Sequence, residues 1–402
     1  MTRAGTDVPC LMFYCHQTTQ QATPGNTYNN RTGTKTMQEP KETATVIELF
    51  FHLIKCGMGK AQELPRTPDT QEWDEMFNMA KKQTLAGIAF AGIEKLPQEQ
   101  RPPKTTLLQW YNLAVLIRKT NAGLNKKCIA VSEKFKSEGF ANCILKGQGL
   151  AQLYPDPTLR TPGDIDIWLD GGDRKAIEYV KRYFPDCSPT YHHVDFPINP
   201  DLEIEIHYRP SWSYSPITDK RLQRFFLSQS QEQFNNLIST PEGCFPAPTT
   251  AFNRIYILLH IYRHLFFEGI GMRQILDYYY VLQQEMTGKE KAEYISALKH
   301  LKLKKFAGAL MYAMQQMFGL DEAHTFVKPN PKLGKFLMQE IMIAGNFGKY
   351  DHRYNLGKHE YSFKRALETI KRNTTLITRF PGEILWSPYF KTWHYFWRKR
   401  HE

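Results

Sequence analysis

The stretch Arg160-Thr-Pro-Gly-Asp164-Ile-Asp166-Ile-Trp-Leu-Asp170 alternates acidic residues with isoleucine, and so does the later stretch Glu203-Ile-Glu205-Ile-His207. Successive side chains of a strand point to opposite faces, so each stretch places its acids on one face and its isoleucines on the other. If the two strands are neighbours, about 4.8 Å apart, three or four carboxylates converge on one sheet face. Such a cluster repels itself unless a cation lies within it. The pattern therefore predicts a site for a hard divalent ion, Mg²⁺ above all, and for metal-assisted phosphoryl chemistry.

The composition limits the class of protein. The chain has 402 residues, 42% of them hydrophobic, which is enough to bury a large core in two or three domains. Its formal charge of +12 favours polyanionic partners, among them nucleic acid, nucleotide triphosphates and acidic membrane surfaces. Seven scattered cysteines without a C-x-x-C pair argue against a zinc or disulfide framework and indicate a cytoplasmic protein. No apolar stretch approaches the roughly 18 residues of a membrane-spanning helix, so no transmembrane segment is expected.

Changes in periodicity divide the chain. Residues 1–43 are rich in Thr, Gln, Asn, Gly and Pro and lack the features of a secretory signal, so we expect a disordered leader. Apolar residues at helical spacing predict an N-terminal helical region over 44–139. The period changes to two in the core, 140–212, and a C-terminal helical domain follows over 213–402. The predicted fold class is α+β, with a small mixed sheet and its helices flanked by helical regions.

Four strands are expected in the core. The first, 143–145, runs into Lys146-Gly147, and the second, 164–169, carries the paired aspartates. Two further strands, about 191–198 and 202–208, flank Asn199-Pro200-Asp201, which is a turn signal for a hairpin. After Pro210 only helices are expected.

These motifs resemble the nucleotidyltransferase superfamily that includes DNA polymerase beta, whose pattern is a Gly-containing strand end, a Dx[DE] strand and a later single acid. The chain is more closely similar to one bacterial branch, the uncharacterised nucleotidyltransferase family. The segments that carry the resemblance are Leu145-Lys146-Gly147, Arg160, Gly163-Asp164-Ile165-Asp166-Ile167 and Ile204-Glu205-Ile206-His207. Four downstream residues fit the family's helical signature: His260, His264, Arg273 and Asp277. The resemblance spans roughly residues 44–400.

The resemblance implies a transferase that moves a nucleoside monophosphate from an NTP such as ATP to an acceptor hydroxyl and releases pyrophosphate. Asp164 and Asp166 would bridge two Mg²⁺ or Mn²⁺ ions about 4 Å apart. Glu205 would be the third metal ligand and the candidate general base. Glu203 is the competing assignment because it shares a face with Glu205, and a solvated acid at the sheet edge is its simpler interpretation.

Four residues are candidates for binding the nucleotide. Lys146 and Arg160 can hold the triphosphate, although an ion pair with the acidic cluster explains each equally well. Gly147 and Gly163 can let the backbone approach phosphate, or can simply form turns. Gln148 is a departure, because many superfamily members have at this position a serine that contacts the triphosphate.

Other polar pairs have simpler explanations than catalysis. His260 and His264, at i and i+4 of a predicted helix, permit shared metal ligation, but we favour packing or a hydrogen bond to substrate. Arg273 and Asp277 have the same spacing and are expected to form an ion pair.

A second hypothesis is a catalytically inactive module of the same fold that binds RNA or another polyanion. The positive charge and the missing serine support it, as does the tail over 364–400, where basic and aromatic residues interleave. Such a tail can contact nucleic acid or a membrane surface, or it can be a capping helix with a solvated basic face. The acceptor stays open among small molecules, sugars, proteins and RNA.

Overall fold

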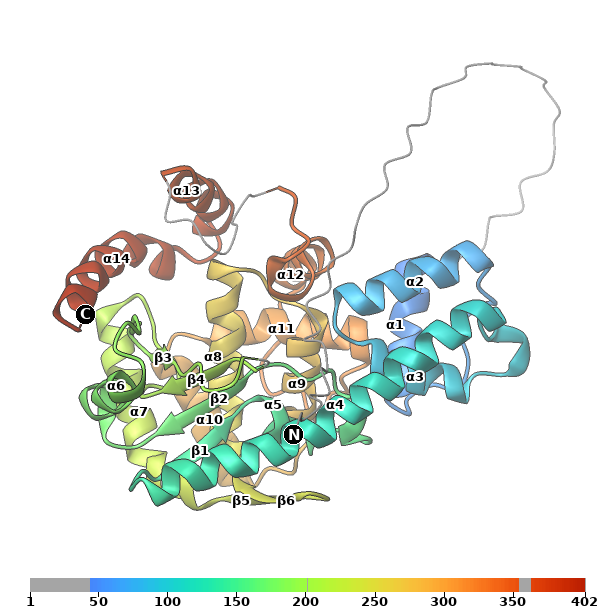
Figure 1. The fold of residues 1–402 in the computed structure, drawn as a ribbon. Helices are drawn as coiled ribbons and strands as arrows, with labels where there is room; N and C mark the ends of the chain where they lie inside the picture. The colour runs from blue at the N-terminus through green and yellow to red at the C-terminus, as the bar shows by residue number, and fades with distance from the viewer. Residues whose placement is uncertain (1–43, 201, 354–362, 402) are drawn as a thin grey trace, which may run out of the picture.

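The computed structural model describes residues 44–200, 202–353 and 363–401, and the expected leader over 1–43 lies outside them. Helices surround one small mixed sheet, which confirms the predicted α+β class (Figure 1). None of the helices within the described residues is long and apolar enough to cross a membrane.

The sheet has four strands in the order β1-β2-β4-β3. Strand β2 (Ile165–Leu169) lies antiparallel to β1 (Asn142–Leu145) and parallel to β4 (Ile204–His207). Strand β3 (His193–Asp195) pairs antiparallel with β4, so the expected hairpin is confirmed with shorter strands. Strand β2 also begins one residue later than expected, which leaves Asp164 just outside it.

The alternating pattern sorts side chains onto the two faces of the sheet. Ile165 and Ile167 are buried in an apolar cluster with residues of α4 (Lys104–Ser137) and α6 (Gly172–Tyr183). Trp168 faces the opposite way and stacks on Phe252 of α8 (Thr250–Phe267), with the ring centroids 5.8 Å apart. Asp166 therefore lies on the face that α8 covers, because it is two residues from Trp168.

Two of the N-terminal helices, α3 (Ala86–Lys95) and α4, contact the segment that leads into β2. The N-terminal helices are α1 (Val46–Gly57), α2 (Thr70–Lys82), α3 and α4, and a short 3-10 turn, η1 (Gln98–Gln100), precedes α4. Asn121 of α4 donates hydrogen bonds to the carbonyls of Thr158 and Arg160 at 2.7 and 2.8 Å. Gly87 of α3 lies so close that a Cβ there would be 2.1 Å from the carbonyl oxygen of Leu159, in the turn η2 (Pro157–Leu159). The loop before the paired aspartates thus rests on α3 and α4.

The part of the chain after Pro210 contains a hairpin that the sequence analysis missed. Strands β5 (Leu237–Thr240) and β6 (Gly243–Pro246) form a second, two-stranded sheet. The turn between them is Pro241-Glu242, and Gly243, the first residue of β6, has a φ of +139° that an L side chain rarely adopts. Phe245 is buried in the same apolar cluster as Ile144 of β1, so the hairpin adds to the core of the main sheet. The expectation of helices only was therefore wrong.

The remaining elements are helical. They are α5 (Gly147–Ala151), α7 (Pro216–Asn235), α9 (Met272–Leu282), α10 (Gly288–His300), α11 (Lys304–Phe318), α12 (Pro331–Ala344), the 3-10 turn η3 (Asn346–Gly348), α13 (Phe363–Ile377) and α14 (Pro381–His401).

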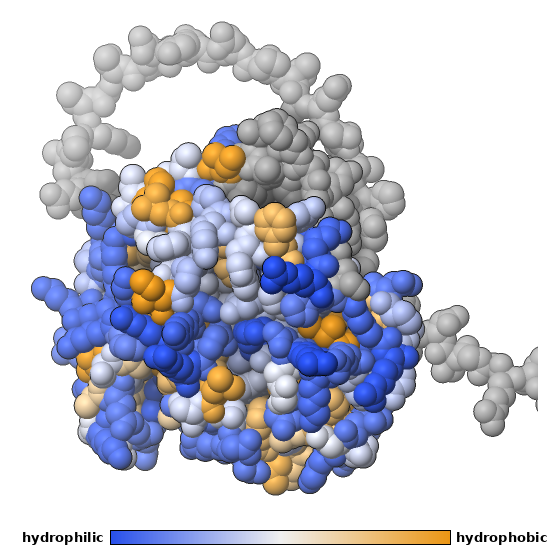
Figure 2. All heavy atoms as spheres, turned by 90° about the vertical axis from the view of Figure 1, so that its left-hand side faces the viewer, coloured by the Kyte–Doolittle hydropathy of each residue, from blue (hydrophilic) through white to orange (hydrophobic). Residues whose placement is uncertain are grey.

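Helix α14 packs beside β3 through aromatic residues. Phe390 stacks on Trp212 with the ring centroids 4.2 Å apart, and Tyr191, just before β3, contacts Trp393 and Trp397 edge to face. On this side of the molecule, apolar residues form separate patches among hydrophilic ones (Figure 2). The arrangement agrees with a capping helix, and contact of the tail with nucleic acid or a membrane stays a prediction.

Acid is expected to loosen α14. His394 stacks on Phe390 and Trp397, and burial, with Arg398 nearby, lowers the pKa of His394 from 6.5 to about 4. The folded pKa lies below the unfolded one, so the stabilisation is present above pH 6.5 and is lost as the pH falls through 4. Acrylamide quenching of tryptophan fluorescence should therefore increase over this range. In His394→Gln the increase should be smaller, and an identical pH profile would contradict the assignment.

Candidate active site

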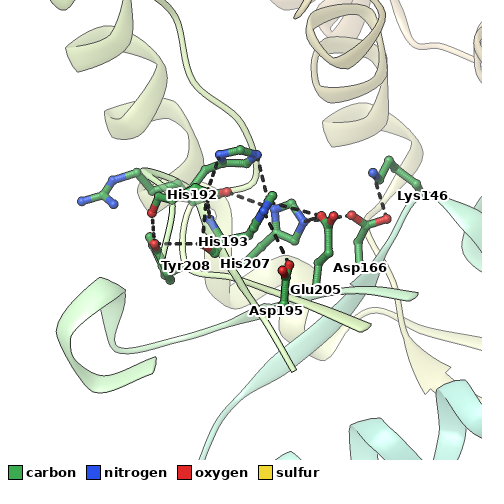
Figure 3. A network of polar contacts seen from close by, with 10 residues as sticks. Lys146, Asp166, His192, His193, Asp195, Glu205, His207 and Tyr208 are labelled. Atoms are coloured by element: carbon green, nitrogen blue, oxygen red, sulfur yellow. Dashed lines mark hydrogen bonds and ion pairs between the residues drawn. The ribbon is translucent and has the colours of Figure 1, made fainter. Parts of the chain in front are cut away.

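Asp166 and Glu205 lie side by side at the centre of the sheet. They are register partners on the parallel strands β2 and β4, so their side chains share one face. The Nε2 atom of His207 lies 2.8 Å from Asp166 Oδ1 and 3.2 Å from Glu205 Oε2 (Figure 3). One ligand atom from each of these three residues lies within 4.8 Å of the other two. The donors fit a divalent cation, because carboxylate and imidazole are common ligands of such ions.

The two acids that precede the strands differ in position. Asp164 is half-buried one residue before β2 and lines the same cavity as Asp166, but it does not belong to the compact group of three. Glu203 is exposed one residue before β4. The structure thus places Glu205 in the cluster and Glu203 outside it.

Lys146 supplies positive charge to the acidic face. It follows β1, whose Leu145 is the register partner of Asp166, and its Nζ lies 2.8 Å from Asp166 Oδ2. Burial alone would lower the pKa of Lys146, but Asp166 and neighbouring groups outweigh burial and raise it, so Lys146 stays charged. Its backbone has a φ of +52°, which is strained for a residue with a side chain. The expected ion pair with the acidic cluster is therefore present.

His207 is the second positive charge of the cluster. Burial would lower the pKa of His207, but hydrogen bonds to Asp166 and Glu205 raise it to about 9. Burial would likewise raise the pKa of Glu205, but His193, His207 and Lys146 lower it to about 2. The positive charges of Lys146 and His207 thus balance the negative charges of Asp166 and Glu205. This balance explains how the two carboxylates can lie so close together.

A small cavity with a volume of about 30 Å³ borders Asp164 and Asp166. Its walls come from the loop 160–164, from Lys146-Gly147, from α8, from α9 and from Phe347. His260, Arg273 and Asp277 all line it, so three of the four downstream residues singled out in the sequence converge on the site. His264 packs behind them, with its ring 4.2 Å from His260 and 4.9 Å from Phe347.

The acidic cluster lies in a part of the chain that matches a known protein family. A profile of the uncharacterised nucleotidyltransferase family matches residues 69–319. The chain belongs to this family. The match runs from the N-cap of α2 to the C-cap of α11, and it includes the main sheet, the acidic cluster and every residue that lines the cavity except Phe347. No curated protein gives a significant match. Membership in a nucleotidyltransferase family supports a transferase with a nucleotide substrate, while the wider superfamily and a bacterial source stay predictions.

In this member of the nucleotidyltransferase family, Arg160 forms a buried ion pair with α9. Its Nε and Nη2 atoms donate to the two carboxylate oxygens of Asp277 at 2.7 and 2.8 Å. The expected pairing of Asp277 with Arg273 is therefore wrong. Arg273 instead donates to the carbonyl of Thr161 at 2.9 Å, because the tertiary fold brings the loop against α9. Both arginines fix the segment that carries Asp164, and contact of Arg160 with a triphosphate stays a prediction.

Gln148, the residue noted in the sequence as a departure from the predicted superfamily pattern, is bonded to α4. Gln148 is buried, and its Nε2 donates to Asn125 Oδ1 of α4 at 2.5 Å. Any phosphate contact near this position would therefore need another group. Gly147, with a φ of +35°, and the exposed Gly163 both line the cavity. A Cβ at either position would have no neighbour closer than 3.8 Å, so each position has room for an added methyl group.

Three polar residues of the site were not predicted from the sequence: His192, His193 and Asp195. The pairing of β3 with β4 brings His193 opposite His207 and Asp195 opposite Glu205. His193 Nδ1 lies 3.2 Å from Glu205 Oε2 and 3.1 Å from Nε2 of His192 (Figure 3). The sequence did contain a signal for them. His193 and Asp195 are two residues apart in a strand that was predicted to form a hairpin with the strand that carries Glu205, so they were expected to share one face of the sheet.

Proposed function

We propose that the chain is a metal-dependent nucleotidyltransferase that transfers a nucleoside monophosphate from an NTP to an acceptor hydroxyl. The hydroxyl releases its proton to solvent and its oxygen attacks the α-phosphorus, the bond from that phosphorus to the oxygen that bridges to the β-phosphate breaks, and pyrophosphate leaves. The observation that carries the proposal is the adjacent pair Asp166 and Glu205 on parallel strands, beside a cavity that Asp164 also lines.

Three carboxylates are proposed as the ligands of Mg²⁺ or Mn²⁺, as one ion or two: Asp164, Asp166 and Glu205. Bound divalent cations would neutralise the charge of the triphosphate and polarise the reacting phosphate. A cation held by Asp166 would compete with the 2.8 Å contact of Lys146, and Lys146 would then be available to a phosphate oxygen. Gly147 and Gly163 line the same cavity and are proposed to let the backbone approach that phosphate.

The positively charged surroundings of Glu205 favour one of its two possible roles, metal ligand or general base. Its pKa of about 2 keeps the carboxylate ionised at neutral pH, as a metal ligand requires. A base so weak takes up a proton inefficiently, because catalytic proton transfer works best with a pKa near the working pH. We therefore propose Glu205 as a cation ligand rather than as the general base.

The transfer reaction can be tested by label transfer. Incubation with α-³²P-labelled NTPs, Mg²⁺ or Mn²⁺ and cell extract should label an acceptor in the presence of the wild-type chain. The double variant Asp164→Asn/Asp166→Asn should lose this activity by roughly 1,000-fold or more, because the charges that hold the cations are gone. Asp170→Asn, beyond the other end of β2, is the matched control and should retain it. Equal transfer by the double variant would contradict the proposal, and a mass-shift screen identifies the acceptor and the nucleotide.

A second candidate function is an inactive module that binds RNA or another polyanion. Two observations favour it: Gln148 is bound to α4, and Lys146 with His207 already neutralises the carboxylates. Under this hypothesis, RNA is retained in a salt-dependent way that the double variant leaves unchanged. A cytoplasmic location stays a prediction under either function.

A further inference from the structure

Helix α14 lies at the edge of the molecule and presents a stripe of apolar and aromatic side chains to solvent (Figure 1). At 3.6 residues per turn, these side chains occupy one arc of about 100° on the helix and extend for about 16 Å along it. Their exposed fractions range from 39% to 67%. A surface helix normally turns such an arc toward the core, so its exposure here indicates a partner. The members of the stripe are Leu385, Trp386, Tyr389, Trp393 and Phe396.

The opposite face of α14 is fixed to the protein, which keeps the stripe outward. Glu383, in the first turn, is buried and accepts a hydrogen bond from Ser213 Oγ at 2.6 Å. The Nη1 atom of Arg263 lies 3.2 Å from the same carboxylate. Two turns further along, Phe390 stacks on Trp212. Rotation of α14 to bury the stripe would break this buried ion pair, and breaking one is strongly destabilising.

The charge of α14 has one sign beyond its first turn. Four cations lie between residues 384 and 401, and the sequence has no aspartate or glutamate there. Helical spacing places Arg400 on the arc of the stripe beyond Phe396, and Lys399 at its border. Both cations are exposed. The surface around the stripe is therefore complementary to a negatively charged partner.

The kinds of side chain favour a lipid surface over RNA. Trp and Tyr are enriched where a membrane meets water, and helices that lie in this interface combine Trp, Phe and Leu with Lys and Arg. Single-stranded RNA instead stacks successive bases on the faces of aromatic rings. Trp386 and Tyr389 pack edge to face, with their rings inclined at 79°, so they do not form a flat platform. Leu385, a member of the stripe that is exposed, has no ring on which a base could stack.

We propose that α14 binds the surface of an anionic lipid membrane. The stripe lies among the headgroups with its long axis in the plane of the membrane, and Lys399 and Arg400 lie beside the negatively charged groups of the lipids. The buried face of α14 stays packed on the rest of the chain. This proposal does not depend on nucleotidyl transfer.

Binding to vesicles of defined composition tests the proposal. The full chain is mixed, without NTP, with vesicles of phosphatidylcholine that contain about 30% phosphatidylserine or with vesicles of phosphatidylcholine alone, and sedimentation gives the bound fraction. We expect the anionic vesicles to bind at least roughly 10-fold more tightly, and added salt to weaken this binding, because each cation near an anionic surface contributes about fivefold. Brominated acyl chains should quench tryptophan fluorescence, because Trp386 and Trp393 would lie at the level of the headgroups.

Two variants separate the apolar contribution from the charged one. Leu385→Ser/Tyr389→Ser/Phe396→Ser removes the three most exposed members of the stripe and should bind anionic vesicles roughly 10-fold more weakly or worse. Lys399→Gln/Arg400→Gln should weaken binding roughly 10- to 30-fold. The second variant guards against misfolding, because it changes only exposed polar side chains, and circular dichroism checks the fold of both.

The matched control is Leu108→Ser/Tyr111→Ser/Val115→Ser. It removes three apolar side chains of α4 that are 43% to 57% exposed, and it should leave vesicle binding unchanged. Failure of the wild type to bind anionic vesicles, unchanged binding in either α14 variant, or an equal loss in the control would overturn the proposal. So would retention of poly(U) RNA, but not of vesicles, by a surface that the α14 triple variant destroys. Label transfer is measured separately, so failure of the transferase proposal remains distinguishable.

Discussion

Replacing Asp277 with asparagine is expected to lower the free energy of unfolding by about 3–5 kcal/mol, because removing one partner of a buried ion pair leaves the other charge uncompensated. Asp277 accepts two hydrogen bonds from Arg160 and one from the hydroxyl of Tyr154, at 2.7–2.8 Å, and all three side chains are buried. The amide keeps the shape of the carboxylate but removes its charge. Urea unfolding at neutral pH, compared with wild type, measures the difference.

Two further variants make the Asp277 result specific. Glu178→Gln removes an exposed ion pair with Arg174 and should leave the unfolding transition where it is. The double variant Arg160→Met/Asp277→Leu should recover most of the lost stability, because an apolar pair of similar size can replace a buried ion pair. If Asp277→Asn costs less than about 1 kcal/mol, the ion pair is not the anchor of the loop.

Glu205→Gln should reduce label transfer by roughly 1,000-fold, or about 4 kcal/mol of transition-state stabilisation, whereas Glu203→Gln should stay within about threefold of wild type. The two glutamates are two residues apart and share a strand pattern. Only Glu205 has a carboxylate close to His207 and beside Asp166, while Glu203 is exposed and precedes β4. Transfer rates at saturating NTP and Mg²⁺ give the comparison.

Stability must be measured alongside that comparison. Glu205→Gln removes a negative charge beside His193 and His207, so the variant can also be less stable, and its rates are meaningful only at temperatures where circular dichroism shows a folded protein. Loss of transfer in Glu203→Gln equal to that in Glu205→Gln would show that the acids were assigned wrongly.

The strands that carry the acids could be predicted because their pattern is local. Ile165 and Ile167 alternate with Asp166, and a period of two places the acid opposite the core wherever the strand lies. The pairing of Asp166 with Glu205 followed from assuming that the two strands are neighbours, and the structure confirms it. The β5–β6 hairpin was missed because its strands are only four residues long and lie between helices with much stronger periodicity.

The partners of the buried arginines could not be read from the sequence. Spacing on a helix suggested Arg273 for Asp277, but Arg160, 117 residues earlier in the chain, takes that position. Helix spacing describes neighbours on one helix and carries no information about a loop that packs against it. The same limit applies to Gln148, whose partner Asn125 belongs to a helix that ends before β1 begins.

The contacts of α3 and α4 with the loop before β2 affect how the protein can be divided. The change of periodicity near residue 139 looks like a domain boundary, yet Asn121 and Gly87 on its N-terminal side support the backbone at Thr158, Leu159 and Arg160. A fragment that begins at residue 140 would lose this support and expose the faces of the sheet and loop that α3 and α4 cover. We infer that any shortened version meant for crystallisation or assay must keep α3 and α4, because these two helices support the loop that precedes Asp164.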